Sequence, residues 1–152
     1  MEQDDLEIVI LKSVPSQHLS SVNLPVGQRF AALSSSSGQV LLAYAPEQEI
    51  LRVFNGSSEY ARRRVGWGSD EEIVAHFAAV RAAGFALTEK MEDLDSLSLS
   101  SPVFGPKDLP VGAINISTLK TRFSKSQAEK NLAPELLEGC RLASGLLGRS
   151  QT

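Results

Sequence analysis

The stretch Ser96–Thr118, SLSLSSPVFGPKDLPVGAINIST, decides the fold class, because it contains two strand candidates and a turn between them. Ser96–Phe104 begins with a strict alternation of serine and leucine, and Pro110–Thr118 predicts a second strand. The loop GPKDLP between them suits an antiparallel hairpin. One face of the first strand is expected to hold Leu97, Leu99 and Ser101, and the other face Ser96, Ser98 and Ser100.

The residues on either side of this hairpin predict helices and one more strand. In SDEEIVAHFAAVRAAG, Ser69 and Glu72 have capping-box spacing and Gly84 closes a helix. A strand is expected over Phe85–Glu89. A terminal helical region begins at Ser124, where Gln127 completes another capping box; Pro134 kinks or restarts it, and its apolar stripe is Leu136, Cys140, Ala143 and Leu147.

The N-terminal half predicts shorter elements. Glu7–Val14 is rich in β-branched residues and predicts a strand, His18–Leu24 predicts a second, more polar strand, and Leu24–Phe30 predicts a turn or loop. Pro46 suits the first turn of a helix that ends at Asn55–Gly56. That helix is expected to bury Ile50, Leu51, Val53 and Phe54, whereas the segment ARRRVGW, residues 61–67, is expected to be a solvated loop.

The segment ALSSSSGQVLLAYAP, Ala32–Pro46, is either a flexible linker or the polar entrance of a helix. No second independent core is recognisable on either side of it, so we interpret it as a helix entrance beginning at Ser36 or Ser37. The order of elements then predicts one α+β domain over residues 1–152, with helices packed on an antiparallel sheet.

Composition excludes several classes of function. The chain has 152 residues, a net charge of −3 and one cysteine, Cys140, so neither strong nucleic-acid binding nor an internal disulfide is expected. The acidic N-terminus and its short apolar core predict neither a signal peptide nor a membrane span, and we expect a cytoplasmic protein. His18, His76 and Cys140 have no metal-ligand spacing, so no metal and no cofactor is expected.

Enzymatic chemistry has little support in the sequence. The serines lack a Gly-x-Ser-x-Gly elbow, and neither histidine lies in a motif that would mark it as their base. Cys140 falls on an apolar helix stripe, which is typical of a core position rather than of a nucleophile. A non-enzymatic binding domain is therefore the leading interpretation. The alternative is a small free-standing protein that binds, or acts on, a small metabolite.

Three blocks of the sequence, in order and at matching spacing, resemble the effector-binding C-terminal domain of IclR-type bacterial transcription regulators. They are PVGQRFAALSSSSGQVLLAYAPEQEI, AAVRAAGFALTEK and SLSLSSPVFGPKDLPVGAINISTLKTRF. The positions that match the family pattern are Gly27, Arg29, Gly38, Leu41, Leu42, Ala43, Gly84, Phe85, Ala86, Pro102, Val103, Ala113, Ile114, Ile116 and Ser117. The resemblance implies a GAF-like or PAS-like fold, in which helices flank a central antiparallel sheet and a small-molecule pocket lies on one sheet face.

The resemblance also implies a set of effector contacts: Leu19, Val22, Phe30, Ser36, Ser37, Thr88, Ser98, Asn115 and Ser117. The chain departs from the family pattern at four positions. Leu33 replaces a histidine, Gln39 a lysine, Thr88 an acidic residue and Ser98 a cysteine. The alternative is a purely structural role, in which the serine run only caps a helix and Ser98 and Asn115 face solvent.

The implied partner is a small effector, and we expect a carboxylic acid. Backbone amides at Ser36 and Ser37 would hold the acid, and Gly38 would let it approach the backbone. The resemblance implies a homodimer or homotetramer. It also implies DNA binding only through a winged helix-turn-helix that this sequence does not contain, and no contact with a membrane.

Overall fold

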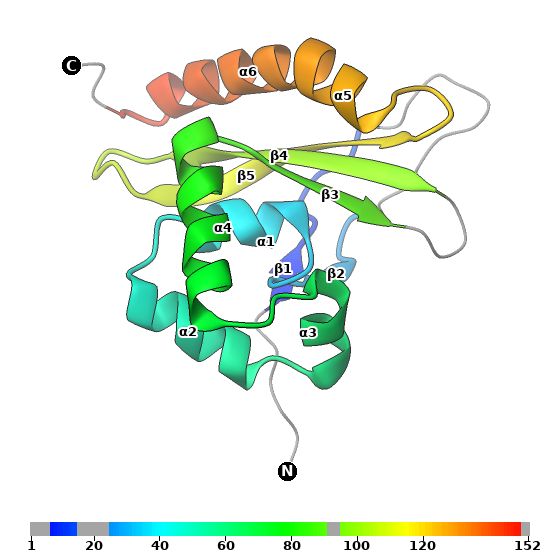
Figure 1. Ribbon diagram of the computed structural model, residues 1–152. Coiled ribbons are helices and arrows are strands. Elements are labelled where there is room, and N and C mark those ends of the chain that lie inside the picture. Colours follow the sequence, from blue (N-terminus) through cyan, green and yellow to red (C-terminus); the bar gives the residue numbers. More distant parts are fainter. Residues whose placement is uncertain (1–6, 15–24, 91–94, 150–152) are drawn as a thin grey trace.

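The computed structural model describes residues 7–14, 25–90 and 95–149, and all structural statements below concern these residues. In chain order its elements are β1 (Glu7–Val9), β2 (Arg29–Ala31), α1 (Ser36–Leu42), α2 (Glu47–Gly56), α3 (Glu59–Val65), α4 (Asp70–Ala83), β3 (Ala86–Lys90), β4 (Ser96–Phe104), β5 (Pro110–Leu119), α5 (Lys125–Gln127), the π-helical turn η1 (Ala128–Leu132) and α6 (Ala133–Leu146). Figure 1 shows a central sheet with α5 and α6 on one side and α1–α4 on the opposite side. The predicted α+β class is confirmed.

The described part of the central sheet has the antiparallel order β3-β4-β5. The predicted hairpin is present, and β4 begins and ends at the predicted residues. Its register aligns residues across all three strands. Ser98 faces Thr88 on one side and Ser117 on the other, and Ser100 faces Ala86 and Asn115. One polar row therefore crosses all three strands, and a second polar pair joins β4 to β5 on the same face.

Each face of the sheet packs against its own helices. On one face Leu97, Leu99 and Val103 form a core with Leu136 and Cys140 of α6. On the other face lies α1, whose Val40 belongs to a second core with residues of α4 and Ala86. Because both faces are covered, Ser96 and Ser100 are buried, at 6% and 0% exposure. Polar residues in an alternating strand are more often exposed, and here the covering helix reverses that outcome.

A separate two-stranded ribbon joins β1 to β2, with Ile8 opposite Phe30. The strand at Glu7 is shorter than predicted. The predicted turn is present, but it ends earlier than predicted, because Arg29 and Phe30 already belong to β2. Gly27, at φ 90°, makes the turn, and the chain is extended again from Arg29. The predicted strand His18–Leu24 lies outside the described residues.

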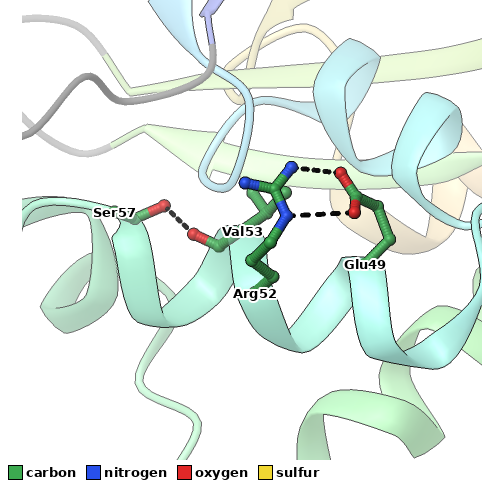
Figure 2. A network of polar contacts seen from close by, with 4 residues as sticks. All are labelled: Glu49, Arg52, Val53 and Ser57. Atoms are coloured by element: carbon green, nitrogen blue, oxygen red, sulfur yellow. Dashed lines mark hydrogen bonds and ion pairs between the residues drawn. The ribbon is translucent and has the colours of Figure 1, made fainter.

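Helix α3 was predicted as a solvated loop, and that prediction is wrong. The Ser58 side chain caps it by accepting a hydrogen bond from the Ala61 N–H at 3.1 Å, and Gly66 ends it at φ 70°. Helix α2 follows Pro46 as predicted. Figure 2 shows its polar contacts: Arg52 pairs with Glu49 on the exposed side, and the Ser57 hydroxyl donates to the Val53 carbonyl at 2.7 Å.

The remaining helix ends largely follow the sequence signals. Ser69 caps α4 by accepting from the Glu72 N–H, but the Glu72 carboxylate accepts from Gly68 instead of completing the box. The capping box of Ser124 and Gln127 is complete. Leu147 was predicted on the buried stripe of the last helix. This prediction is wrong, because α6 ends at Leu146 and Leu147 is 49% exposed.

Candidate functional site

The site begins where α1 meets the sheet. Ser35 caps α1 by accepting a hydrogen bond from the Gly38 N–H at 3.1 Å. A Cβ built on Gly38 would lie 2.1 Å from the Ala32 carbonyl oxygen, so glycine is the residue that fits here. The expectation that Gly38 opens the backbone to a ligand is therefore wrong, because the backbone of Ala32 occupies that space.

A cluster of hydroxyls and one amide ties the start of α1 to β4 and β5. Ser36 and Ser37, at 2% and 8% exposure, each place their Oγ 2.8 Å from the Oγ of Ser100. The Asn115 side-chain amide donates to the Oγ of Ser36 at 3.0 Å and to that of Ser100 at 2.9 Å. We call Ser36, Ser37, Ser98, Ser100, Asn115 and Ser117 the hydroxyl cluster.

The hydrogen-bond directions in this cluster follow from what each group can do. Asn115 Oδ1 can only accept, so the Ser117 hydroxyl donates to it at 2.7 Å. The Ser117 proton is thereby used, and Ser98, 2.9 Å away, must donate to the Ser117 oxygen. Ser100 accepts a hydrogen bond from the Asn115 amide. Its hydroxyl proton is donated to one of Ser36 and Ser37, and its second lone pair accepts from the other. Every hydroxyl of the cluster therefore has a partner, and Ser100 has three.

A cavity of about 180 Å³ lies next to this cluster, between α1, α3, α4 and the edge strand β3. Its lining residues are Ser34, Gln39, Arg64, Val65, Trp67, His76, Leu87, Thr88 and Glu89. Thr88 also sits in the polar row with Ser98 and Ser117, so it stands between the two features. The hydroxyl cluster is filled and internally bonded, whereas the cavity is open space.

Gln39 and His76 fix one wall of the cavity. Gln39 is 3% exposed and its Nε2 donates to the Leu33 carbonyl at 3.0 Å, so its Oε1 faces His76. Since Oε1 accepts, the His76 Nε2 at 2.9 Å carries a proton. Burial lowers the pKa of His76 below its usual value, which favours the neutral ring. The neutral tautomer then leaves Nδ1 as an acceptor.

The sequence and the fold match proteins of known class. Residues 1–144 match the family described as bacterial transcriptional regulator IclR, C-terminal. This chain belongs to the IclR family of bacterial transcriptional regulators. The resemblance stated from the sequence is confirmed.

Regulators from several bacteria are similar to this IclR-family chain. The Pca regulon regulatory protein of Pseudomonas putida is 30% identical over 142 residues, which cover 93% of this chain and 48% of that protein. The transcriptional repressor IclR of Escherichia coli is 23% identical over 117 residues, covering 77% and 43%. The chain thus spans about half the length of the curated relatives it matches. The relatives are regulators of transcription, which agrees with the expectation of a non-enzymatic domain.

Solved structures of regulators share the fold of this IclR-family chain. A putative transcriptional regulator from Rhodococcus sp. RHA1 superposes with a TM-score of 0.83 at 28% identity, over 95% of this chain and 58% of that one. The inducer-binding domain of PobR from Acinetobacter, solved with 3-hydroxybenzoic acid, gives 0.75 at 19% identity, over 94% and 84%. The second likeness concerns the fold alone.

The structure of this IclR-family domain brings five of the predicted contact residues together in the hydroxyl cluster: Ser36, Ser37, Ser98, Asn115 and Ser117. Thr88 adjoins them, and Phe30 lies on β2 opposite Ile8, outside both the cluster and the cavity lining described above. Leu19 and Val22 lie outside the described residues. The alternative that Asn115 merely faces solvent is wrong, because its amide makes three hydrogen bonds.

Sequence reasoning missed Ser100, Gln39, His76 and Trp67 as members of this region. Ser100 carried a signal, since it shares the alternating face of Ser98.

Across the described ranges there is no group of three or more potential metal ligands and no helix long and apolar enough to cross a membrane. Cys140 is buried in the core under α6, and burial raises the pKa of its thiol.

Proposed function

We propose that this domain senses a small organic acid and passes the binding event to a DNA-binding segment of the same polypeptide. The observation that carries the proposal is the hydroxyl cluster, in which Asn115 joins β5 to Ser36 at the start of α1. Family membership supports a role in transcription regulation, and the solved inducer-binding domain of PobR supports ligand binding by this fold.

The hydroxyl cluster is suited to exchange its partners. Serine hydroxyls rotate freely about their C–O bonds, so a ligand oxygen can replace one internal acceptor without leaving the others unpaired. Such an exchange would alter the contacts between α1 and the sheet, which are made here by Ser36, Ser37 and Ser100. Binding and a shift of α1 would then be linked, as a sensor requires.

The donors in this cluster favour a carboxylate over a cation. Ser36, Ser37 and the amide of Asn115 can all donate, and hydrogen bonds to a charged acceptor contribute about 1.5–3 kcal/mol each. Helix α1 has only seven residues, so we assign the recognition to these side chains rather than to the helix end.

The rest of the regulator is inferred from the relatives. The chain covers about half of their length, so we place a helix-turn-helix in the remaining part of the same polypeptide. We further propose that these domains associate as dimers or tetramers, and that the protein acts in the cytoplasm, where the DNA is. A coding segment for a helix-turn-helix in frame with this domain would support the first point.

Calorimetry and thermal shift against a panel of small carboxylic acids test the proposal. A ligand that binds only the folded state should raise the melting temperature, and Asn115→Leu or Ser98→Ala should weaken its affinity about tenfold or more. Asn131→Leu, at an exposed position of η1, is the matched control and should not change the affinity. If a carboxylate binds and both cluster variants keep the wild-type affinity, this assignment is wrong.

A further inference from the structure

Phe104 lies at the end of β4, where the two faces of the sheet come together. The register with β5 shifts between Val103 and Phe104, and the Phe104 N–H donates to the Ser144 hydroxyl of α6 at 2.9 Å. Ser144 is 1% exposed and donates in turn to the Cys140 carbonyl at 2.7 Å. The backbone of Phe104 is therefore bound directly to α6.

The ring of Phe104 reaches the helices on the opposite face. Tyr44, which follows the C-cap of α1, packs against it edge to face, with the ring centroids 5.0 Å apart at 85°. The Arg149 guanidinium, beyond the end of α6, lies 3.8 Å from the Phe104 centroid, and that of Arg81 in α4 lies 5.1 Å from the Tyr44 centroid. Both distances suit a cation–π contact. We call Arg149, Phe104, Tyr44 and Arg81 the aromatic stack.

Arg149 is held in the stack by further contacts. Its guanidinium donates to the carboxylate of Asp108, in the turn between β4 and β5, and its N–H donates to the Ser144 carbonyl at 3.0 Å. In Figure 1 this turn and the C-terminal end of α6 lie at the same end of the sheet. The stack is therefore a connection around that end, between helices that lie on opposite faces.

We propose that the aromatic stack is a conformational strap, which passes a shift of α1 around the end of the sheet to the C-terminal end of α6. Helix α1 is held at its first turn by Asn115 on Ser36 and at its other end by Tyr44 on Phe104. A displacement of α1 thus moves Tyr44 against a residue whose backbone is bound to α6. The use of this link in sensing rests on the proposed function, whereas the link itself does not.

Hydrogen exchange of the domain without any ligand tests the link. The Ala43 and Ala45 amides report on the end of α1, because they donate to the Gln39 and Leu42 carbonyls. In Arg149→Gln they should exchange about two- to fivefold faster relative to the amides of β4, the factor that corresponds to one exposed cation–π contact.

Arg141→Gln is the matched control. Arg141 also belongs to the C-terminal half of α6, but it pairs with Glu138 on the exposed side of that helix. This variant should leave the exchange of Ala43 and Ala45 unchanged.

The link should also operate in the opposite direction. Ser36→Ala removes a partner of Asn115 at the first turn of α1, and the amides of Gly148 and Arg149 should then exchange about two- to fivefold faster. Phe104→Leu keeps an apolar side chain but lacks the ring, and it should abolish this response to Ser36→Ala. Combining Arg149→Gln with Ser36→Ala gives the same comparison at the Gly148 amide without altering the buried ring.

Two outcomes would overturn the proposal. One is an effect of Arg149→Gln that is confined to the turn at Asp108 and the residues after α6, with Ala43 and Ala45 unchanged. The other is a response to Ser36→Ala that persists when the stack is broken. If the strap variants behave as expected and no carboxylate binds the domain, this inference holds while the proposed function fails, so the two can be told apart.

Discussion

The amide of Asn115 on β5 donates a hydrogen bond of 3.0 Å to the hydroxyl of Ser36 at the first turn of α1, across 79 residues of sequence. The same amide donates to Ser100, which also contacts Ser36 and Ser37. The start of α1 is therefore held on the sheet by polar side chains, while Val40, further along the helix, lies in an apolar core. The two ends of a short helix are thus fixed by different physical interactions.

Removing the central hydroxyl should destabilise the domain. Ser100→Ala leaves Ser36, Ser37 and Asn115 each short of one partner at a fully buried position. We expect a loss of about 1–3 kcal/mol in the free energy of unfolding, measured by urea denaturation. Ser126→Ala, at an exposed position of α5, is the control and should change it by less than about 0.5 kcal/mol. Equal stabilities of the two variants would contradict the hydrogen-bond assignment.

Position 38 should tolerate no side chain. In Gly38→Ala the new methyl would meet the Ala32 backbone at 2.1 Å, and backbone cannot rotate away as a flexible side chain can. We expect at least about 1–3 kcal/mol of destabilisation, the usual cost of overpacking. Gly139→Ala in α6 is the matched control: no atom lies within 4 Å of its added methyl, and alanine favours helix there by about 0.5–1 kcal/mol. Opposite signs are expected for the two variants.

His76 should make stability fall on mild acidification. Its pKa in the folded domain is lowered by burial, so the unfolded chain binds a proton first. The free energy of unfolding should therefore decrease as the pH falls below the unfolded value of about 6.5, until the folded pKa is passed. His76→Gln keeps a neutral donor towards Gln39 and should flatten this slope. Because the chain has two histidines, the comparison of variant and wild type isolates His76. An unchanged slope would count against the buried neutral ring.

The isolated domain should self-associate. Two-fold assembly is the commonest oligomeric form, and the proposed regulator needs one for a symmetric DNA site. Light scattering at tens of micromolar should give at least twice the mass of the chain, which is 16.4 kDa. A mass of one chain across that range would contradict this part of the proposal.

Local sequence signals predicted the hairpin and the caps well. Strand β4 ends where Gly105 and Pro106 interrupt the pattern, and Gly84, at φ 82°, closes α4 as its position indicated. Helix α3 was missed because its buried side is narrow: Ala61 is the buried residue, and three arginines follow it. Such a segment lacks the apolar stripe on which helix prediction depends.

The candidate site was predicted only in part, because its assembly is a long-range event. Alternation in β4 indicated that Ser98 and Ser100 share a face, but it could not indicate that α1 covers that face. The contact between Ser36 and Ser100 joins positions 64 residues apart. The cavity was missed for the same reason, since Trp67, His76 and Thr88 come from three separate segments. The alternation of residues along a strand indicates which face of the sheet each side chain lies on. It does not indicate which helix packs against that face.

The order of donors in the hydroxyl cluster makes its members interdependent. Ser98 donates a hydrogen bond to Ser117, and Ser117 donates one to Asn115. Asn115 in turn donates to Ser36 and Ser100. Each group in this network shares a partner with the next, so a change in one hydrogen bond alters the strength of its neighbours. The energetic effects of substitutions along it are therefore coupled and do not add. The network therefore joins Ser98 on β4 to the first turn of α1 through side chains alone.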